Sequence, residues 1–408
     1  MIVKEKEIAL NLSNKRRMTK WRKIDIGEFA DFNPAEKIEK GKLAKKVPMA
    51  MLTEFQRKIK GFEFSNYQSG PKFRNGDTLV AKITPCLENG KTAQVDILEK
   101  GEVAFGSSEF IVLRENENSI NNYIFYLARS PVFRERAISC MEGTSGRKRI
   151  NEGALKRQEI SVPDKLTQQK IASVLSALDE KIELNNRIND NLKQMAKALY
   201  DYWFVQFDFP DKDGKPYKSN GGMMVWDEEL KRKIPEGWRV NGLNEILELE
   251  YGKPLKECDR SGQGFPVVGS NGIVGYHSES FVKGPGIVIG RKGSAGEITW
   301  VDEDFFPIDT TYYIKDKMGS ELLVFHYYLL KKLNLKKIES SSAVPGLNRN
   351  IVYSLKSETP PNLLLIKFNN TVNPIFSNIA SIKKQNQLLI FLRDWLLPML
   401  MNGQVTVE

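Results

Sequence analysis

The sequence predicts a duplicated protein in which two mixed α/β (α+β) globular domains alternate with two long helices that pair as an antiparallel coiled coil. Three similarities between the halves predict this pseudo-two-fold internal repeat: a heptad pattern ending each half, a glycine-containing loop before each pattern, and a Trp-Arg pair opening each globular part. An internal repeat fixes the architecture within which every local prediction must fit.

The heptad pattern predicts the two helices. Seam positions alternate by four and three from Ile171 to Trp203 and again from Phe368 to Leu400, and the two patterns align at one constant offset. This spacing is typical of a coiled coil, and helices this amphipathic are expected to pair with each other. The predicted seam consists of Leu175, Leu178, Ile182, Asn189, Leu192, Leu199, Val372, Ile375, Ile379, Asn386, Leu389 and Leu396.

Polar residues and a proline interrupt this seam. Asn189 corresponds to Asn386, and buried amides at such positions would set the register at some cost in stability. Solvent-facing amides on a frayed stretch of helix are the alternative. Arg393 breaks the apolar stripe, and Pro398 is expected to kink or end the second helix.

The other two similarities occur at different offsets. Gly146 corresponds to Gly346, which places Leu155 opposite Leu355, and the Trp-Arg pair beginning at Trp21 recurs at Trp238. Chance resemblance of two amphipathic helices is the alternative, but three matches in the same order favour duplication.

The repeat divides the chain into five parts. They are a first globular domain (1–162), a central long helix (163–207), a linker (208–234), a second globular domain (235–361) and a C-terminal long helix (362–408). The linker is rich in turn-forming residues, which marks the break between halves. Strands are predicted at 78–83, 103–113, 286–290 and 311–314, and helices at 121–129 and 320–333.

Composition limits the classes of function. There are 61 Lys and Arg against 51 Asp and Glu, a net charge of +10, which suits a nucleic acid or an anionic membrane face. Three distant cysteines and two histidines offer little for a disulfide framework, a zinc site or a histidine-dependent triad. Without an apolar run of about 18 residues or a secretory signal, no membrane span is expected and a cytoplasmic location is the default.

Motifs for catalysis are not recognised in the sequence. We find no Walker loop, dinucleotide fingerprint, G-x-S-x-G elbow or amino-methyltransferase tetrapeptide. Two patterns imitate a metal-dependent nuclease, Pro163-Asp164 with Asp179-Glu180-Lys181, and Pro210-Asp211 with Asp213-Gly214-Lys215. Such sites place carboxylates on adjacent strands, whereas these lie on a predicted helix or in the linker.

Polar loops offer the candidate binding residues instead. Arg can read guanine and Asn adenine, whereas Lys and Thr more often hold phosphate. For a single residue an ordinary turn with solvated charge is the simpler reading, but loops placed equivalently in both halves favour DNA contact. The candidates are Lys82, Thr84, Asn89, Lys91, Ser145, Arg147, Lys148, Arg149, Asn271, Arg291, Lys292, Thr310, Thr311, Asn348 and Arg349.

With these features in place, the sequence resembles the specificity subunit of a type I restriction–modification system, from about Trp21 to Gln404. The most telling stretches are Gly76–Lys91, Leu166–Trp203, Asp208–Trp238 and Val344–Arg349. The resemblance implies two target-recognition domains, each reading one half of a split, asymmetric site in double-stranded DNA. Base-contacting residues vary widely in such domains and are not carried over.

The resemblance also implies partners. Two DNA methyltransferase (M) subunits would dock on the helices and restriction (R) subunits would join them, so the chain itself would be a non-catalytic subunit. S-adenosylmethionine, ATP and Mg²⁺ would bind to the partners and no cofactor to this chain. Trp395, which lies off the seam, is expected to face a partner.

Three other readings remain open. The chain could be the recognition subunit of a related type II-like enzyme, an autonomous DNA-modifying enzyme with a degenerate site, or a scaffold that does not bind DNA. Salt-dependent duplex binding would separate the last from the others.

Overall fold

The computed structural model describes residues 21–144, 146–318, 322–340 and 346–407. The chain forms two compact units, unit 1 (1–184 and 385–408) and unit 2 (185–384). Each unit therefore contains one globular part and half of each long helix. The predicted linear division at residues 162, 207, 234 and 361 remains a prediction. Among the described residues, no helix is both long and apolar enough to cross a membrane.

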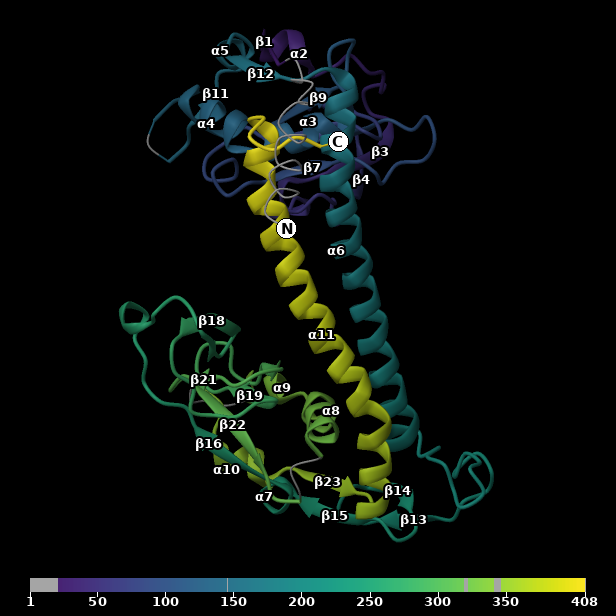
Figure 1. The fold of residues 1–408 in the computed structure, drawn as a ribbon. Helices are drawn as coiled ribbons and strands as arrows, with labels where there is room; N and C mark the ends of the chain where they lie inside the picture. Colours follow the sequence, from purple (N-terminus) through teal and green to yellow (C-terminus); the bar gives the residue numbers. More distant parts are fainter. Residues whose placement is uncertain (1–20, 145, 319–321, 341–345, 408) are drawn as a thin grey trace, which may run out of the picture. The chain divides into compact units, whose positions relative to one another are not determined.

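Unit 1 is built on two four-stranded sheets and a terminal strand pair (Figure 1). One sheet has the order β2-β9-β6-β7, the other β4-β3-β8-β5, and β1 pairs antiparallel with β12. The strands are β1 (Arg22–Asp25), β2 (Asp31–Phe32), β3 (Leu43–Val47), β4 (Glu63–Asn66), β5 (Lys72–Phe73), β6 (Thr78–Ala81), β7 (Thr92–Gln94), β8 (Ala104–Gly106), β9 (Phe110–Arg114), β10 (Met141–Glu142), β11 (Arg149–Ile150) and β12 (Glu159–Val162). The helices are α2 (Ile26–Phe29), α3 (Asn121–Arg129), α4 (Pro131–Ser139) and α5 (Glu152–Lys156).

Unit 2 repeats this plan with one strand fewer in its second sheet. Its sheets have the orders β16-β22-β19-β20 and β18-β17-β21, and β15 pairs with β23. The strands are β13 (Met224–Asp227), β14 (Arg232–Pro235), β15 (Arg239–Gly242), β16 (Leu247–Tyr251), β17 (Phe265–Gly269), β18 (Gly272–His277), β19 (Gly286–Gly290), β20 (Ile298–Val301), β21 (Phe306–Pro307), β22 (Thr311–Asp316) and β23 (Lys356–Thr359). The helices are α7 (Leu243–Ile246), α8 (Leu323–Leu333), α9 (Leu335–Ser340) and α10 (Arg349–Ser354).

Strand pairing confirms the duplication and corrects one of its registers. Arg22 pairs with Val162 in unit 1, and Arg239 pairs with Thr359 in unit 2. Val162 and Thr359 are therefore equivalent, at the same offset that aligns the two long helices. Leu155 then corresponds to Val352, whereas the sequence comparison had placed it opposite Leu355. The Gly-x-x-Arg motif occurs in both loops, and aligning the loops on this motif gave the wrong register.

The predicted strand at 103–113 is also corrected. It is two strands, β8 and β9, which belong to different sheets. The connection between them turns at Ser107, whose carbonyl accepts from Phe110 N at 3.1 Å. Both strands are fully buried, so the apolar run carried no alternation that would have revealed the turn.

The long helices are α6 (Lys165–Tyr200), which continues as a π-helical turn (Asp201–Val205), and α11 (Asn362–Met401). Figure 1 shows α6 (teal) beside α11 (yellow) in each unit, running antiparallel. In unit 1, Leu175 of α6 shares a core with Leu397 and Leu400 of α11. In unit 2, the ring of Trp203 lies 5.6 Å from that of Phe368.

All twelve predicted seam residues are buried or half-buried, Asn189 and Asn386 included. Arg393 is also buried, because its guanidinium has an acidic partner in α6, Asp179. The helix does not stop at Pro398 but continues to Met401. The next turn packs Leu400 and Met401 into the core of unit 1.

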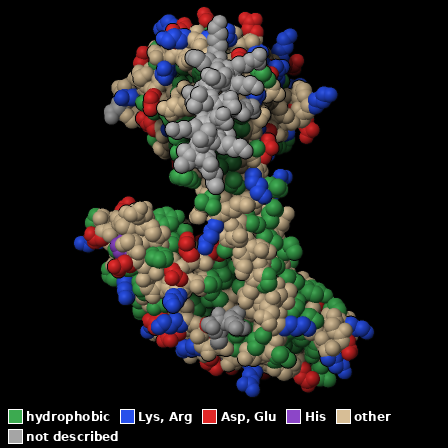
Figure 2. All heavy atoms as spheres, in the orientation of Figure 1, with side chains coloured by type: hydrophobic (Ala, Val, Ile, Leu, Met, Phe, Trp, Pro, Cys, Tyr) green, Lys and Arg blue, Asp and Glu red, His purple; other side chains and the backbone are tan. Residues whose placement is uncertain are grey.

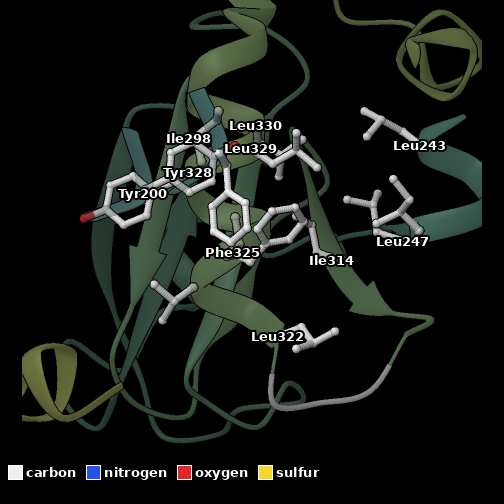
Figure 3. Close-up of a cluster of buried hydrophobic side chains, with 14 of the residues drawn as sticks. Tyr200, Leu243, Leu247, Ile298, Ile314, Leu322, Phe325, Tyr328, Leu329 and Leu330 are labelled. Carbon is white, nitrogen blue, oxygen red and sulfur yellow. The ribbon is translucent and has the colours of Figure 1, made fainter. Parts of the chain in front are cut away.

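The core of unit 2 lies between its first sheet, α8 and the helix pair. Figure 3 shows Phe325, Tyr328, Leu329 and Leu330 of α8 gathered with strand residues such as Ile298 and Ile314. The ends of α6 and α11 in unit 2 belong to the same cluster. This core holds the sheet, and so the loops that follow its strands, in a fixed position.

Candidate nucleic-acid interface

Two of the predicted loops meet in unit 1. Thr84 N donates to Lys148 O at 3.0 Å, and Lys148 N donates to Thr84 Oγ1 at 3.0 Å. Ile150 N donates to Lys82 O at 2.9 Å. The segment after β6 and the segment before α5 therefore form one surface, although they are distant in the sequence. Ser145, a candidate in the second loop, lies outside the described residues.

Carboxylates neutralise part of this unit 1 surface. Lys82 Nζ lies 3.1 Å from Glu152 Oε1, and Arg149 is held by Glu109 at 2.8 Å. The hydrogen bond from Arg149 is the main cause of the lowered pKa of Glu109. Lys91 is half-buried and its Nζ is directed at the carbonyl of Met49.

The remaining unit 1 candidates are more accessible. Asn89, Arg147 and Lys148 are exposed, and within the part of the chain that the structure describes neither cation forms an ion pair. They are the unit 1 side chains best placed to meet a polyanion.

Four loops converge in unit 2, around the carbonyl of Thr310. This oxygen accepts from Arg291 N at 2.8 Å, from Lys292 N at 3.1 Å and from Ser270 Oγ at 2.7 Å. Leu347 N in turn donates to Arg291 O at 2.8 Å. The turn that contains Asn271 and the start of α10 are thereby brought to the ends of β19 and β22.

A hollow of about 370 Å³ lies where these loops meet. It is lined by Tyr251, Arg291, Lys292, Tyr312, Gly346, Leu347, Asn348, Arg349 and Asn350. Four of the predicted residues line it, which the sequence could not show because they come from two loops that are far apart along the chain. Asn348 also caps α10, since its side chain accepts from Asn350 N at 2.8 Å.

Two tyrosines that line the hollow were not predicted from the sequence. Tyr251 ends β16, whose alternation of Leu and Glu places it on the buried face, yet it is 47% exposed because that face opens at the strand end. Tyr312 OH donates to Leu347 O at 3.1 Å, and burial raises the pKa of Tyr312 to about 12.

Thr311 does not belong to this surface. It is fully buried, and its hydroxyl donates to Ile308 O at 2.7 Å. The predicted DNA contact is at odds with this burial, because the side chain points into the core at the first position of β22. Thr310, its neighbour, is half-buried and contributes through its carbonyl.

The carboxylates that imitated nuclease motifs have other partners. Asp164 Oδ1 accepts from Thr167 N at 2.8 Å and so caps α6. Asp179 pairs with Arg393 at 2.7 Å, and Asp211 accepts from two backbone amides of its own turn. Their geometry serves the fold, as expected for a helix and a linker.

Charge alone does not mark an interface. Figure 2 shows Lys and Arg side chains interspersed with Asp and Glu on the displayed face of both units. The loop clusters are distinguished by which cations lack an acidic partner, and this property follows from the local pairing of side chains.

Comparison with known proteins decides the family. The family described as "Type I restriction modification DNA specificity domain" matches residues 18–194 and again residues 235–362. The chain belongs to this family. The two matches fall on the two globular parts, so this specificity protein carries the domain twice.

Two relatives of this specificity protein match it along most of its length. It is 29% identical over 313 residues to the type I restriction enzyme MjaIX specificity subunit of Methanocaldococcus jannaschii, covering 71% of this chain and 70% of the relative. It is 25% identical over 421 residues to the HindI specificity subunit of Haemophilus influenzae, covering 83% and 88%. The type I system S subunit from M. genitalium has the same fold, with a TM-score of 0.60, 21% identity and 95% and 98% coverage.

Proposed function

We propose that this chain is the DNA-reading subunit of a type I restriction–modification complex, in which each unit reads one half of a bipartite, asymmetric site. One observation carries the proposal: the first sheets of the two units have the same strand order and present polar loops at equivalent strand ends, Lys82 after β6 and Arg291 after β19. Two different readers on one chain match a site whose two halves differ in sequence.

The outer face of α11 supports docking of a methyltransferase subunit. Leu388, Phe391, Leu392 and Trp395 recur at the spacing of one helix face, and Leu388, Phe391 and Trp395 are 70%, 69% and 49% exposed. Exposed apolar stripes of this kind fit the apolar face of another helix. We call these four residues the α11 stripe.

A weaker counterpart lies in unit 2. Met195, Tyr202 and Val205 are exposed along α6 and the π-helical turn that follows it. One apolar surface on each unit agrees with two methyltransferase subunits per chain. Restriction subunits would then join that assembly.

The catalytic steps would be carried out by these partner subunits. S-adenosylmethionine, ATP and Mg²⁺ are assigned to the methyltransferase and restriction subunits, and this chain contributes sequence reading and docking. The roles of Asp164, Asp179 and Asp211 in the fold agree with this assignment.

Methylome sequencing tests the proposal. Cells that carry this chain with its methyltransferase should show one methylated motif made of two short sequences separated by a fixed gap. Exchanging residues 235–361 for those of another specificity subunit should replace one half of the motif only. Methylation or cleavage of DNA by the purified chain alone, or a continuous motif, would contradict it.

A further inference from the structure

The hollow in unit 2 and the equivalent place in unit 1 differ in charge. Lys82 and Arg291 each follow the last residue of the equivalent strands β6 and β19, and each offers its carbonyl to the segment before the next short helix. Glu152 and Arg349 are each the first residue of that helix, directly after the capping residues Asn151 and Asn348. A Lys–Glu pair in one unit therefore corresponds to an Arg–Arg pair in the other.

In unit 1 the position equivalent to the hollow has no net charge. Glu152 accepts from Lys82 Nζ at 3.1 Å and from Asn33 Nδ2 at 2.8 Å, so both carboxylate oxygens are engaged. Strand pairing puts Ile111 where unit 2 has Tyr312, and the offset that aligns Trp21 with Trp238 puts Pro34 where unit 2 has Tyr251. The unit 1 equivalent has neither the second cation nor the aromatic walls.

In unit 2 the cations are positioned by neutral groups. The guanidinium of Arg291 lies 5.2 Å from the ring centre of Tyr251 and donates to Asp309 O at 2.8 Å. The guanidinium of Arg349 lies 5.3 Å from the same ring. Cation–π contacts and a backbone carbonyl hold a guanidinium in place without cancelling its charge.

The charge of this hollow is therefore uncompensated. No carboxylate lies within ion-pair distance of Arg291, Lys292 or Arg349 among the described residues. The hydrogen-bonding edge of a paired base has no net charge and would leave the positive charges of these three side chains uncompensated. A phosphate oxyanion attracts all three. Guanidinium forks also match the tetrahedral oxygens of phosphate in two-point contacts.

We propose that the hollow formed by Arg291, Lys292, Arg349 and Tyr251 binds a phosphodiester of the DNA backbone. Unit 2 then carries a sequence-independent anchor at the place where unit 1 carries a neutral ion pair. This inference rests on the proposed function, since it names the part of DNA that one of the two readers holds. Arg291 positions the duplex, and bases of that half-site are read by neighbouring side chains such as Asn271.

Salt dependence tests the inference. The chain in complex with its methyltransferase is compared with the Arg291→Gln/Arg349→Gln variant, on duplexes that carry the methylated motif and on scrambled duplexes. Loss of this phosphate contact should make the negative slope of log affinity against log salt shallower by about 1. Affinity should fall by the same factor on every duplex, and the methylated motif should not change.

Two further variants complete the test. Arg291→Lys/Arg349→Lys keeps the charges and should recover most of the slope, which a folding defect would not allow. Lys231→Gln, which removes an exposed lysine paired with Glu228 outside the candidate loops, should leave the slope within about 0.5 of the parent.

Several outcomes would overturn the inference. They are a changed base preference at one motif position with an unaltered slope, no loss of affinity in the double Gln variant, or an equal loss of slope in Lys231→Gln. Failure of the proposed function looks different, because the parent complex would then not distinguish motif duplexes from scrambled ones.

Discussion

At the scale of single residues, Arg393 joins α11 to α6 in unit 1 through a buried ion pair with Asp179. Its Nη1 lies 2.7 Å from Asp179 Oδ1, and Tyr126 OH donates to the other oxygen of that carboxylate at 2.7 Å. Burial lowers the pKa of Arg393, but hydrogen bonding to Asp394 and attraction by Asp179 outweigh this and raise it. In unit 2 the equivalent positions are Ala196 and Phe376, which pack in an apolar core.

Arg393→Ala should therefore destabilise unit 1 strongly. The substitution leaves the carboxylate of Asp179 buried with a weakened set of partners, and breaking buried pairs of this kind costs about 3 kcal/mol or more. Urea unfolding followed by circular dichroism measures the change in unfolding free energy. Lys193→Ala removes an exposed pair with Asp190 and should cost less than about 0.5 kcal/mol. Equal effects of the two substitutions would refute the role of Arg393.

Acid should weaken unit 2 through Glu358. Burial raises the pKa of this carboxyl, but attraction by Lys332 and a hydrogen bond from Arg232 outweigh it, so the pKa lies below its ordinary value of 4.5. A pKa lowered by folding contributes stability above the unfolded value, and that stability is lost as pH falls through the folded value.

The pH profile of unfolding checks this prediction. Unfolding free energy of the parent should fall as pH drops below about 4.5, and Glu358→Gln should show a shallower fall, with lower stability at neutral pH. Glu229→Gln, which alters an exposed pair with Lys356, should follow the parent profile. A Glu358→Gln profile parallel to the parent would exclude the contribution.

Such roles could be predicted only in part from the sequence. Arg393 was recognised as a break in the stripe, but its acidic partner lies in the other helix, 214 residues away. Tyr251 was not predicted as a site residue because the alternation of Leu and Glu along β16 places it on the buried face. A one-dimensional pattern shows which face a residue occupies, and it does not show what that face meets.

At the scale of elements, the α11 stripe carries the docking prediction. Phe391→Ala/Trp395→Ala should abolish co-purification with the methyltransferase, because both side chains are exposed anchors on one helix face. Affinity chromatography of co-expressed subunits measures it.

A matched control is available in unit 1. Leu43→Ala, at a side chain of β3 that is 62% exposed, should leave co-purification unchanged. Retained binding in the double variant would show that the methyltransferase docks elsewhere.

Elements were predictable where periodicity is strong. The helix at 121–129 and the strand at 286–290 were confirmed at the predicted residues, since each has a clear pattern and clear ends. The run at 103–113 was not resolved into two strands, because a fully buried sheet erases alternation. Convergence of loops 290–294 and 346–350 depends on strand order, which local patterns do not encode.

At the scale of the whole molecule, the two units are copies of one fold that carry different loops. The first sheets of both units have the same strand order, and a single offset relates the two copies from the end of each globular part through each helix, which shows one ancestral plan. The two copies differ where they are expected to meet DNA, with Lys82 and Glu152 against Arg291 and Arg349. A shared scaffold with different loops lets one fold meet two half-sites through different contacts.

The paired helices should also set the gap between the two half-sites. Deleting one heptad from each helix at equivalent positions, 184–190 in α6 and 381–387 in α11, preserves the alternation of seam positions. It removes about 10 Å of helix, which corresponds to about three base pairs of DNA. Methylome sequencing should report the same two half-sites separated by a shorter gap. Substituting the exposed residues of those heptads by Ala, without a change of length, should leave the gap as it was. An unaltered gap in the shortened protein would show that spacing is set by the partners and not by these helices.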